Sequence, residues 1–110
     1  MPRDPALARF YARLLGAEVA YETDSFAAVK LDGVWLSMQR VERYRPPTWP
    51  DGPVPQQAHL DLAVADLDDA EGAALEAGAA KSEHQPTPER WRVMIDPAGH
   101  PFCLTTQIPD

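Results

Sequence analysis

The sequence predicts an α+β fold made of two copies of one βαβββ unit. Two segments with the apolar spacing of a helix have the same length, strand-like segments follow each of them, and a turn signal precedes the last strand of each copy. A chain of 110 residues is long enough for one hydrophobic core but not for two domains. We therefore expect a single domain with an incomplete first unit at residues 1–41, a proline-rich linker at 42–56 and a second unit at 57–110.

Each predicted helix carries signals at both ends. Asp4 is a good N-cap before the apolar face of the first helix, and Gly16 suits the left-handed position after its last turn. Asp66 and Gly78 bracket the second helix in the same way, with the same spacing of twelve positions. The apolar face of the first helix consists of residues at i, i+3, i+4, i+7 and i+8: Leu7, Phe10, Tyr11, Leu14 and Leu15.

Strand signals surround the helices. In the first unit they cover residues 18–22, 26–31 and 34–41, with a turn at Asp32-Gly33. In the second unit, residues 57–65 alternate so that His59, Asp61 and Ala63 share one face, and residues 101–108 form the last strand after the Asp96–Gly99 turn.

The repeat predicts that the first unit lacks its first strand. Residues 57–65 lead directly into Asp66, whereas only three residues precede Asp4. Either the start of the chain has been cut or misassigned, or the protein manages without this strand. An unpaired neighbouring strand would be an exposed edge that a second subunit could cover, so we expect a homodimer.

Composition excludes several classes of partner. A formal net charge of −7 argues against a nucleic-acid partner, since binding to phosphates needs a basic face. No apolar run approaches the roughly 18 residues of a membrane span, and no signal peptide is evident. The lone Cys103 cannot form an internal disulfide, so we expect a cytoplasmic protein.

Three segments carry a resemblance to a known family. The paired βαβββ pattern, DPALARFYARLLGAEV, HLDLAVADLDDA and IDPAGHPFCL together resemble the vicinal oxygen chelate superfamily, which includes glyoxalase I, bleomycin-resistance proteins and extradiol dioxygenases. The closer resemblance is to small bacterial glyoxalase-like domain proteins. It implies curled mixed sheets with the helices outside, a small-molecule ligand in the resulting cup, and frequent dimerisation. The superfamily hosts many chemistries, so the resemblance does not specify a reaction.

The same resemblance implies where a metal would be held. His59 matches the ligand on the first strand of the second unit, whereas Cys103 occupies the place of the usual glutamate. Ser37, or Gln39 after a shift of register, takes the corresponding place in the first unit. Because a hard divalent metal needs several oxygen or nitrogen ligands, we expect an incomplete site in which His59 is the one tentative metal ligand.

Other roles remain open for these residues. Asp61, about 7 Å along the strand from His59, could be a further ligand or could orient the imidazole. With Asp61, His59 could instead transfer protons near neutral pH. Cys103 could form a soft pair with His59 for zinc, act as a nucleophile beside a base, or be a buried structural cysteine.

Strand alternation and the linker predict the residues of a ligand-binding face. The side of the last strands that faces away from the helices, the strand of His59, and a tryptophan held among prolines together give His59, Asp61, Trp35, Ser37, Gln39, Trp49, Cys103 and Thr105. The same alternation also describes a solvated outer face of a sheet. Trp49 could belong to a lid over the cup or to a stiff connector.

The resemblance and these residues favour a small-molecule-binding protein of unknown ligand without a complete metal site. The alternative is a metal-dependent lyase, isomerase or dioxygenase that uses His59. A third possibility is a structural dimerisation module whose pocket is filled by its own side chains.

Overall fold

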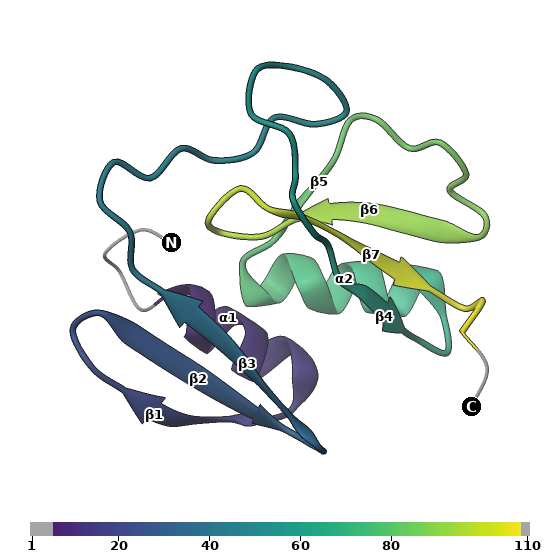
Figure 1. The fold of residues 1–110 in the computed structure, drawn as a ribbon. Helices are drawn as coiled ribbons and strands as arrows, with labels where there is room; N and C mark the ends of the chain where they lie inside the picture. Colours follow the sequence, from purple (N-terminus) through teal and green to yellow (C-terminus); the bar gives the residue numbers. More distant parts are fainter. Residues whose placement is uncertain (1–5, 109–110) are drawn as a thin grey trace. The chain divides into compact units, whose positions relative to one another are not determined.

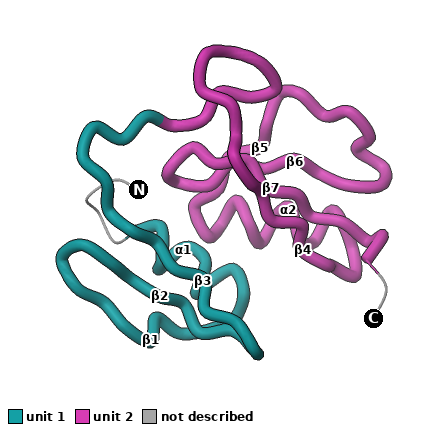
Figure 2. Tube along the Cα trace, viewed as in Figure 1, with its two compact units in different colours: residues 1–45 teal, residues 46–110 magenta. Residues whose placement is uncertain are grey.

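The computed structural model describes residues 6–108 and consists of two compact units (Figure 2). The first unit is Met1–Arg45 and the second is Pro46–Asp110. Most of the proline-rich segment predicted as a linker therefore belongs to the second unit.

The first unit is one helix followed by a three-stranded antiparallel sheet (Figure 1). Its elements in chain order are α1 (Ala6–Leu15), β1 (Glu18–Glu22), β2 (Phe26–Leu31) and β3 (Val34–Gln39), with the sheet order β1-β2-β3. The predicted apolar face of α1 is buried at Leu7, Phe10 and Tyr11. The helix packs against all three strands, and Val29 and Met38 are buried on the sheet.

The predicted chain reversals of the first unit are present. Gly16 follows α1 with a φ of 63°, and Gly33 joins β2 to β3 with a φ of 75°. Both values lie in the left-handed region that glycine adopts without a Cβ penalty. The predicted N-cap Asp4 lies outside the described residues.

The second unit packs one helix against a four-stranded mixed sheet (Figure 1). Its elements are β4 (Asp61–Ala63), α2 (Leu67–Ala77), β5 (Ala80–Lys81), β6 (Trp91–Ile95) and β7 (Pro101–Thr105). The sheet order is β4-β7-β6-β5, in which only the β4–β7 pair is parallel. The core of this unit contains Val93, Met94, Phe102 and Leu104.

The signals that bracket α2 act as the sequence predicts. The Asp66 side chain accepts a hydrogen bond from the backbone N–H of Asp69 at 2.8 Å. The backbone N–H of Gly78 closes the last turn on the carbonyls of Ala74 and Leu75. These bonds satisfy backbone groups that a helix end otherwise leaves unpaired.

The strand predicted at residues 57–65 is much shorter, and the reason is a proline on its neighbour. The backbone N–H of Cys103 donates to the carbonyl of Leu60, and the N–H of Val64 donates to the carbonyl of Thr105, so the ladder extends just beyond β4. Two residues before Cys103 stands Pro101, which has no N–H to donate to Ala58. The ladder therefore begins only after His59, at the carbonyl of Leu60.

Two other strands end earlier than predicted. β3 stops at Gln39, which pairs with Phe26 at the beginning of β2. β7 stops at Thr105, which pairs with Trp91 at the beginning of β6. After Gln39 one further bond forms, from the Arg40 N–H to the Ser25 carbonyl, whereas before Trp91 the chain turns and the Trp91 N–H donates to the Thr87 carbonyl.

The order of the elements confirms the predicted α+β class with a repeated unit. Each copy has a helix followed by three antiparallel strands, and in the second copy β4 pairs with the last of them. α1 begins at Ala6, the first described residue, so the predicted absence of a strand before this helix concerns residues outside the described range. None of the helices in this range is long and apolar enough to cross a bilayer.

Candidate functional site: a cavity on the C-terminal sheet

The register of the second sheet places polar and aromatic residues in two rows on one face. Asp61 of β4 is opposite Cys103 of β7, which is opposite Val93 of β6. The next row on this face contains Thr105 and Trp91. Residues of the opposite parity, such as Phe102 and Leu104, are buried in the core, and β6 and β7 contact α2. The polar face therefore looks away from the helix, as strand alternation predicts.

A cavity of about 450 Å³ lies on this face. Three segments provide its walls: the chain before β4, the loop before β6 and the residues after β7. The lining residues are Trp49, Gln56, His59, Asp61, Pro86, Trp91, Val93, Pro101, Cys103, Thr105, Gln107 and Ile108. All of them belong to the second compact unit.

Trp49 is held in a closed loop. The Oγ1 of Thr48 donates to the carbonyl of Val54 at 3.1 Å and accepts from the N–H of Val54 at 3.0 Å. The indole ring also meets the ring of His84 edge to face, with a centroid distance of 5.1 Å. His84 is itself exposed, yet this ring contact supports the cavity wall. Because these contacts fix the loop, Trp49 needs little ordering when a ligand arrives.

The neighbouring wall, formed by the loop before β6, is fixed by Gln85. Its Nε2 donates to the carbonyls of Ser82 and Val93, and its Oε1 accepts from the N–H of Val93 at 2.9 Å. These bonds hold the loop before β6 against the strand and so position Pro86.

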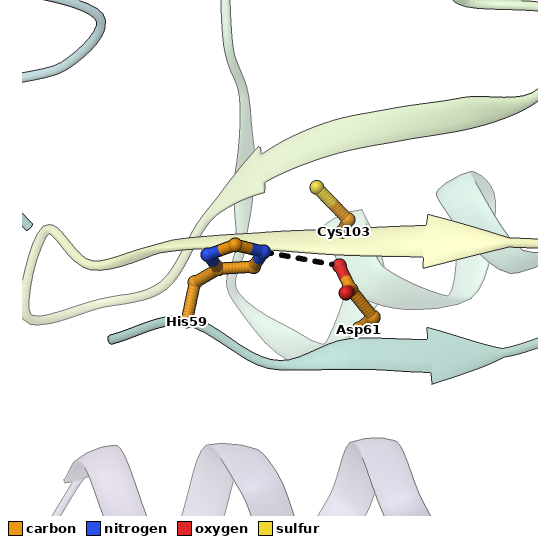
Figure 3. Close-up of side chains that lie close together, drawn as sticks. All are labelled: His59, Asp61 and Cys103. Carbon is orange, nitrogen blue, oxygen red and sulfur yellow. Dashed lines mark ion pairs between the residues drawn. The ribbon is translucent and has the colours of Figure 1, made fainter.

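His59, Asp61 and Cys103 lie close together (Figure 3), and all three line the cavity. The His59 Nε2 lies 3.3 Å from the Asp61 Oδ1, and these side chains are 41% and 53% exposed. One ligand atom from each of the three residues lies within 4.8 Å of the others. The structure therefore brings together three residues that the sequence placed 2 and 42 positions apart.

The Cys103 thiol is protonated at neutral pH. Partial burial raises its pKa to about 11, and the charge of Asp61 together with a hydrogen bond to that carboxylate adds to the increase. A thiolate is the nucleophilic form of cysteine, and a base must be available to generate it. Here the neighbouring carboxylate favours the thiol, so the environment opposes the role of a nucleophile.

The trio meets part of the requirement for a metal. An imidazole, a carboxylate and a thiol are ligands that zinc accepts, and catalytic zinc sites use three protein ligands. Against this, the metal must displace the proton that the surroundings of Cys103 retain. A hard ion such as Mg²⁺ would find only one carboxylate here and no other side-chain oxygen in the trio. The residues thus suit zinc better than the hard metals.

Thr105 and Gln56 differ in how their polar atoms are satisfied. The Thr105 Oγ1 donates to the carbonyl of Arg90 at 3.2 Å and accepts from the N–H of Gln107 at 3.0 Å. The Thr105 hydroxyl is therefore engaged in holding the wall and is less available to a ligand. The Gln56 Oε1 is buried without a hydrogen-bond partner among the described residues. An unpaired buried acceptor costs about 1–3 kcal/mol.

The predicted residues of the first unit lie together on β3. Trp35, Ser37 and Gln39 alternate along the strand and are exposed, whereas Met38 between them is buried. This matches the predicted parity of β3. Their part in ligand binding stays a prediction, since they belong to the first unit and the cavity belongs to the second.

Sequence reasoning missed much of the lining. Trp91, Val93, Gln56, Pro86, Pro101 and Ile108 were not among the predicted ligand-binding residues. The run WRVMI at 91–95, rich in β-formers and followed by the Asp96–Gly99 turn, is a strand signal that identifies Trp91 and Val93. The walls before β4 and β6 have no comparable signal, because loops depend on contacts distant in sequence.

His100 belongs to the turn that leads into β7. Its Nδ1 lies 3.2 Å from the buried carboxylate of Asp96, whose Oδ1 also accepts from the N–H groups of Ala98 and His100. This turn fixes the start of the strand that carries Cys103.

A model of the glyoxalase-like domain matches residues 2–105, and the chain therefore belongs to that family. The match places it in the vicinal oxygen chelate superfamily, as the resemblance of its motifs implied. No curated protein matches the sequence.

Solved structures of the superfamily share the fold. A glyoxalase-related enzyme from Fulvimarina pelagi is 16% identical with a TM-score of 0.67, and the match covers 96% of this chain and 81% of the other. The fosfomycin resistance protein FosX from Mesorhizobium loti is 18% identical with a TM-score of 0.69, over 97% and 86% of the two chains. A glyoxalase/bleomycin resistance protein/dioxygenase family enzyme from Burkholderia phytofirmans is 15% identical with a TM-score of 0.66, over 94% and 90%. At these identities the likeness establishes the fold.

The raised pKa of Cys103 predicts slow alkylation. With a pKa of about 11, the thiolate fraction at pH 8 is roughly two orders of magnitude below that of an unfolded cysteine. Iodoacetamide labelling followed by mass spectrometry should therefore be at least tenfold slower for the native protein than in urea. Asp61→Asn should accelerate native labelling, and Glu76→Gln, which removes an exposed charge elsewhere, should not. Native labelling as fast as in urea would contradict this description of the thiol.

Proposed function

We propose that this protein binds a small organic molecule in the cavity of its second unit, without a complete metal site. The observation that carries the proposal is the cavity itself, whose floor is the polar face of a sheet and whose walls include Trp49 and Trp91. Its volume of about 450 Å³ lies within the range of roughly 300–1,000 Å³ typical of ligand pockets. Several of its polar groups come from residues predicted as ligand contacts: His59, Asp61, Cys103 and Thr105.

The organisation of the walls supports ligand binding more than a solvated sheet face. Hydrogen bonds within the loops at Thr48 and Gln85 fix two walls in advance. A purely structural module would fill this space with its own side chains. A pre-formed cavity reduces the entropy that a protein loses on binding a ligand.

The second candidate is a zinc-dependent lyase, isomerase or dioxygenase of the same superfamily. It is favoured by the convergence of His59, Asp61 and Cys103 within 4.8 Å. These three residues would hold the ion, which when bound would act as a Lewis acid on a substrate oxygen. The protonated thiol places this candidate second.

Two further expectations concern residues of the first unit and the assembly of the protein. Trp35, Ser37 and Gln39 of the first unit are also proposed as ligand contacts, as the resemblance to the superfamily implies. We also propose that the protein is a cytoplasmic homodimer.

Replacing Trp91 should weaken binding of aromatic fragments. A ligand-observed NMR screen of a fragment library should yield hits for the native protein. Their affinity should fall roughly tenfold in Trp91→Ala, since aromatic contacts contribute about 0.5–1.5 kcal/mol beyond their buried area.

Trp91→Phe keeps an aromatic ring and should lose less affinity. It also serves as the test variant if Trp91→Ala does not fold. Tyr21→Ala, which removes an exposed ring from the first unit, should leave the affinity unchanged. An absence of hits, or hits insensitive to both Trp91 variants, would contradict binding in this cavity.

A metal titration separates the two candidates. The melting temperatures of the metal-stripped protein and of His59→Ala should each stay unchanged when Zn²⁺, Ni²⁺, Mn²⁺ or Fe²⁺ is added, because a ligand stabilises the native state only if it binds. A zinc-dependent rise of several degrees that disappears in His59→Ala would establish the metal site and reverse the ranking.

A further inference from the structure

We propose that the cavity selects organic cations, in particular aromatic or heteroaromatic compounds carrying an ammonium group, and disfavours anions. This inference rests on the proposed function, because it names the chemical class of the ligand. It follows from three features of the lining: its charge, its aromatic rings and its hydrogen-bond acceptors.

The charged lining is acidic. Of the described residues around the cavity, none is lysine or arginine, and Asp61 is the only carboxylate. Arg92 and Lys81 of the same unit are engaged elsewhere, where both contact the carboxylate of Glu71. The chain carries a formal net charge of −7, so the average field also attracts cations. An anionic ligand would find no positively charged partner except a protonated His59.

Asp61 has capacity for a further partner. Its carboxylate lies beside the His59 imidazole and accepts from the Cys103 thiol, yet its side chain is 53% exposed. An ionised carboxylate offers about four lone-pair sites, so a ligand ammonium can bind without displacing the thiol.

The two tryptophans supply the aromatic surface. Trp49 and Trp91 both line the cavity, and indole is the side chain that attracts cations best through its ring face. Pro86, Pro101 and Val93 add apolar surface beside them. A ligand with an aromatic body and a cationic group therefore matches both parts of the lining.

Gln56 points to the same chemistry. Its Oε1 is an acceptor without a partner among the described residues, and the residue lines the cavity. A small rotation of the side chain would let this oxygen accept from a ligand N–H. The exposed Asp61 carboxylate and this unpaired amide oxygen are both acceptors, so a ligand that brings donors suits them better than one that brings acceptors.

The test uses three indoles that differ mainly in charge. Tryptamine carries an ammonium, tryptophol a hydroxyl and indole-3-acetate a carboxylate. Dissociation constants are measured by ligand-observed NMR at pH 8, where histidine side chains are ordinarily neutral, in low salt and with EDTA. We expect tryptamine to bind roughly five- to tenfold more tightly than tryptophol, and indole-3-acetate to bind most weakly.

Two variants locate the source of the preference. Asp61→Asn should bring the dissociation constants of tryptamine and tryptophol within about twofold of each other, because it removes the charge that distinguishes the two ligands. Glu76→Gln removes the same charge from an exposed position on α2 and should keep the preference. If Asp61→Asn does not fold, the ratio measured in the native protein still decides.

The outcomes separate the inference from the function beneath it. Equal affinities, a preference for indole-3-acetate, or a tryptamine preference that persists in Asp61→Asn would overturn the inference and leave small-molecule binding intact. If neutral fragments bind and tryptamine does not, the inference is likewise overturned and small-molecule binding stands. No binding by these indoles or by any library fragment would overturn both.

Discussion

The parallel pairing of β4 with β7 is the constraint on which the site depends. It comprises three residue pairs and brings Asp61 beside Cys103, which lies 42 positions later in the chain. Its register is fixed by burial, since Leu104 and Phe102 must face the core while Cys103 and Thr105 face the cavity. A slip of one residue would exchange these faces and place Asp61 against the core. The requirement for a dry core on one side of the sheet thereby determines which side chains are available on the other.

The same pairing determines the chemistry of the cavity. A carboxylate next to a partly buried thiol keeps that thiol protonated and so weakens it both as a nucleophile and as a metal ligand. Asp61 then remains as a negative charge among aromatic and apolar surfaces. These features support the proposed binding of a ligand, in a superfamily that carries diverse reactions on one scaffold.

The parts predictable from sequence are those set by local periodicity. The helix at Leu67–Ala77 with its cap, the glycine turns and the parity of the last strands all follow from neighbouring residues. His59, Asp61, Cys103, Thr105 and Trp49 were identified by parity, by the resemblance or by the proline context. The late start of the β4–β7 ladder, after His59, depends on Pro101 of a strand distant in sequence. The walls depend on hydrogen bonds of Gln85 and Thr48, which the local sequence pattern does not reveal.

The most direct test of metal-free binding in this cavity is a ¹H–¹⁵N correlation spectrum of EDTA-treated protein titrated with tryptophol. The chain has three tryptophans, each with a resolvable indole N–H signal. Binding in this cavity predicts progressive shifts of the Trp49 and Trp91 indole signals and of the backbone amides of Asp61 and Cys103. The Trp35 signal reports whether the first unit takes part. Unchanged Trp49 and Trp91 signals, or shifts that arise only after zinc is added, would contradict metal-free binding in this cavity.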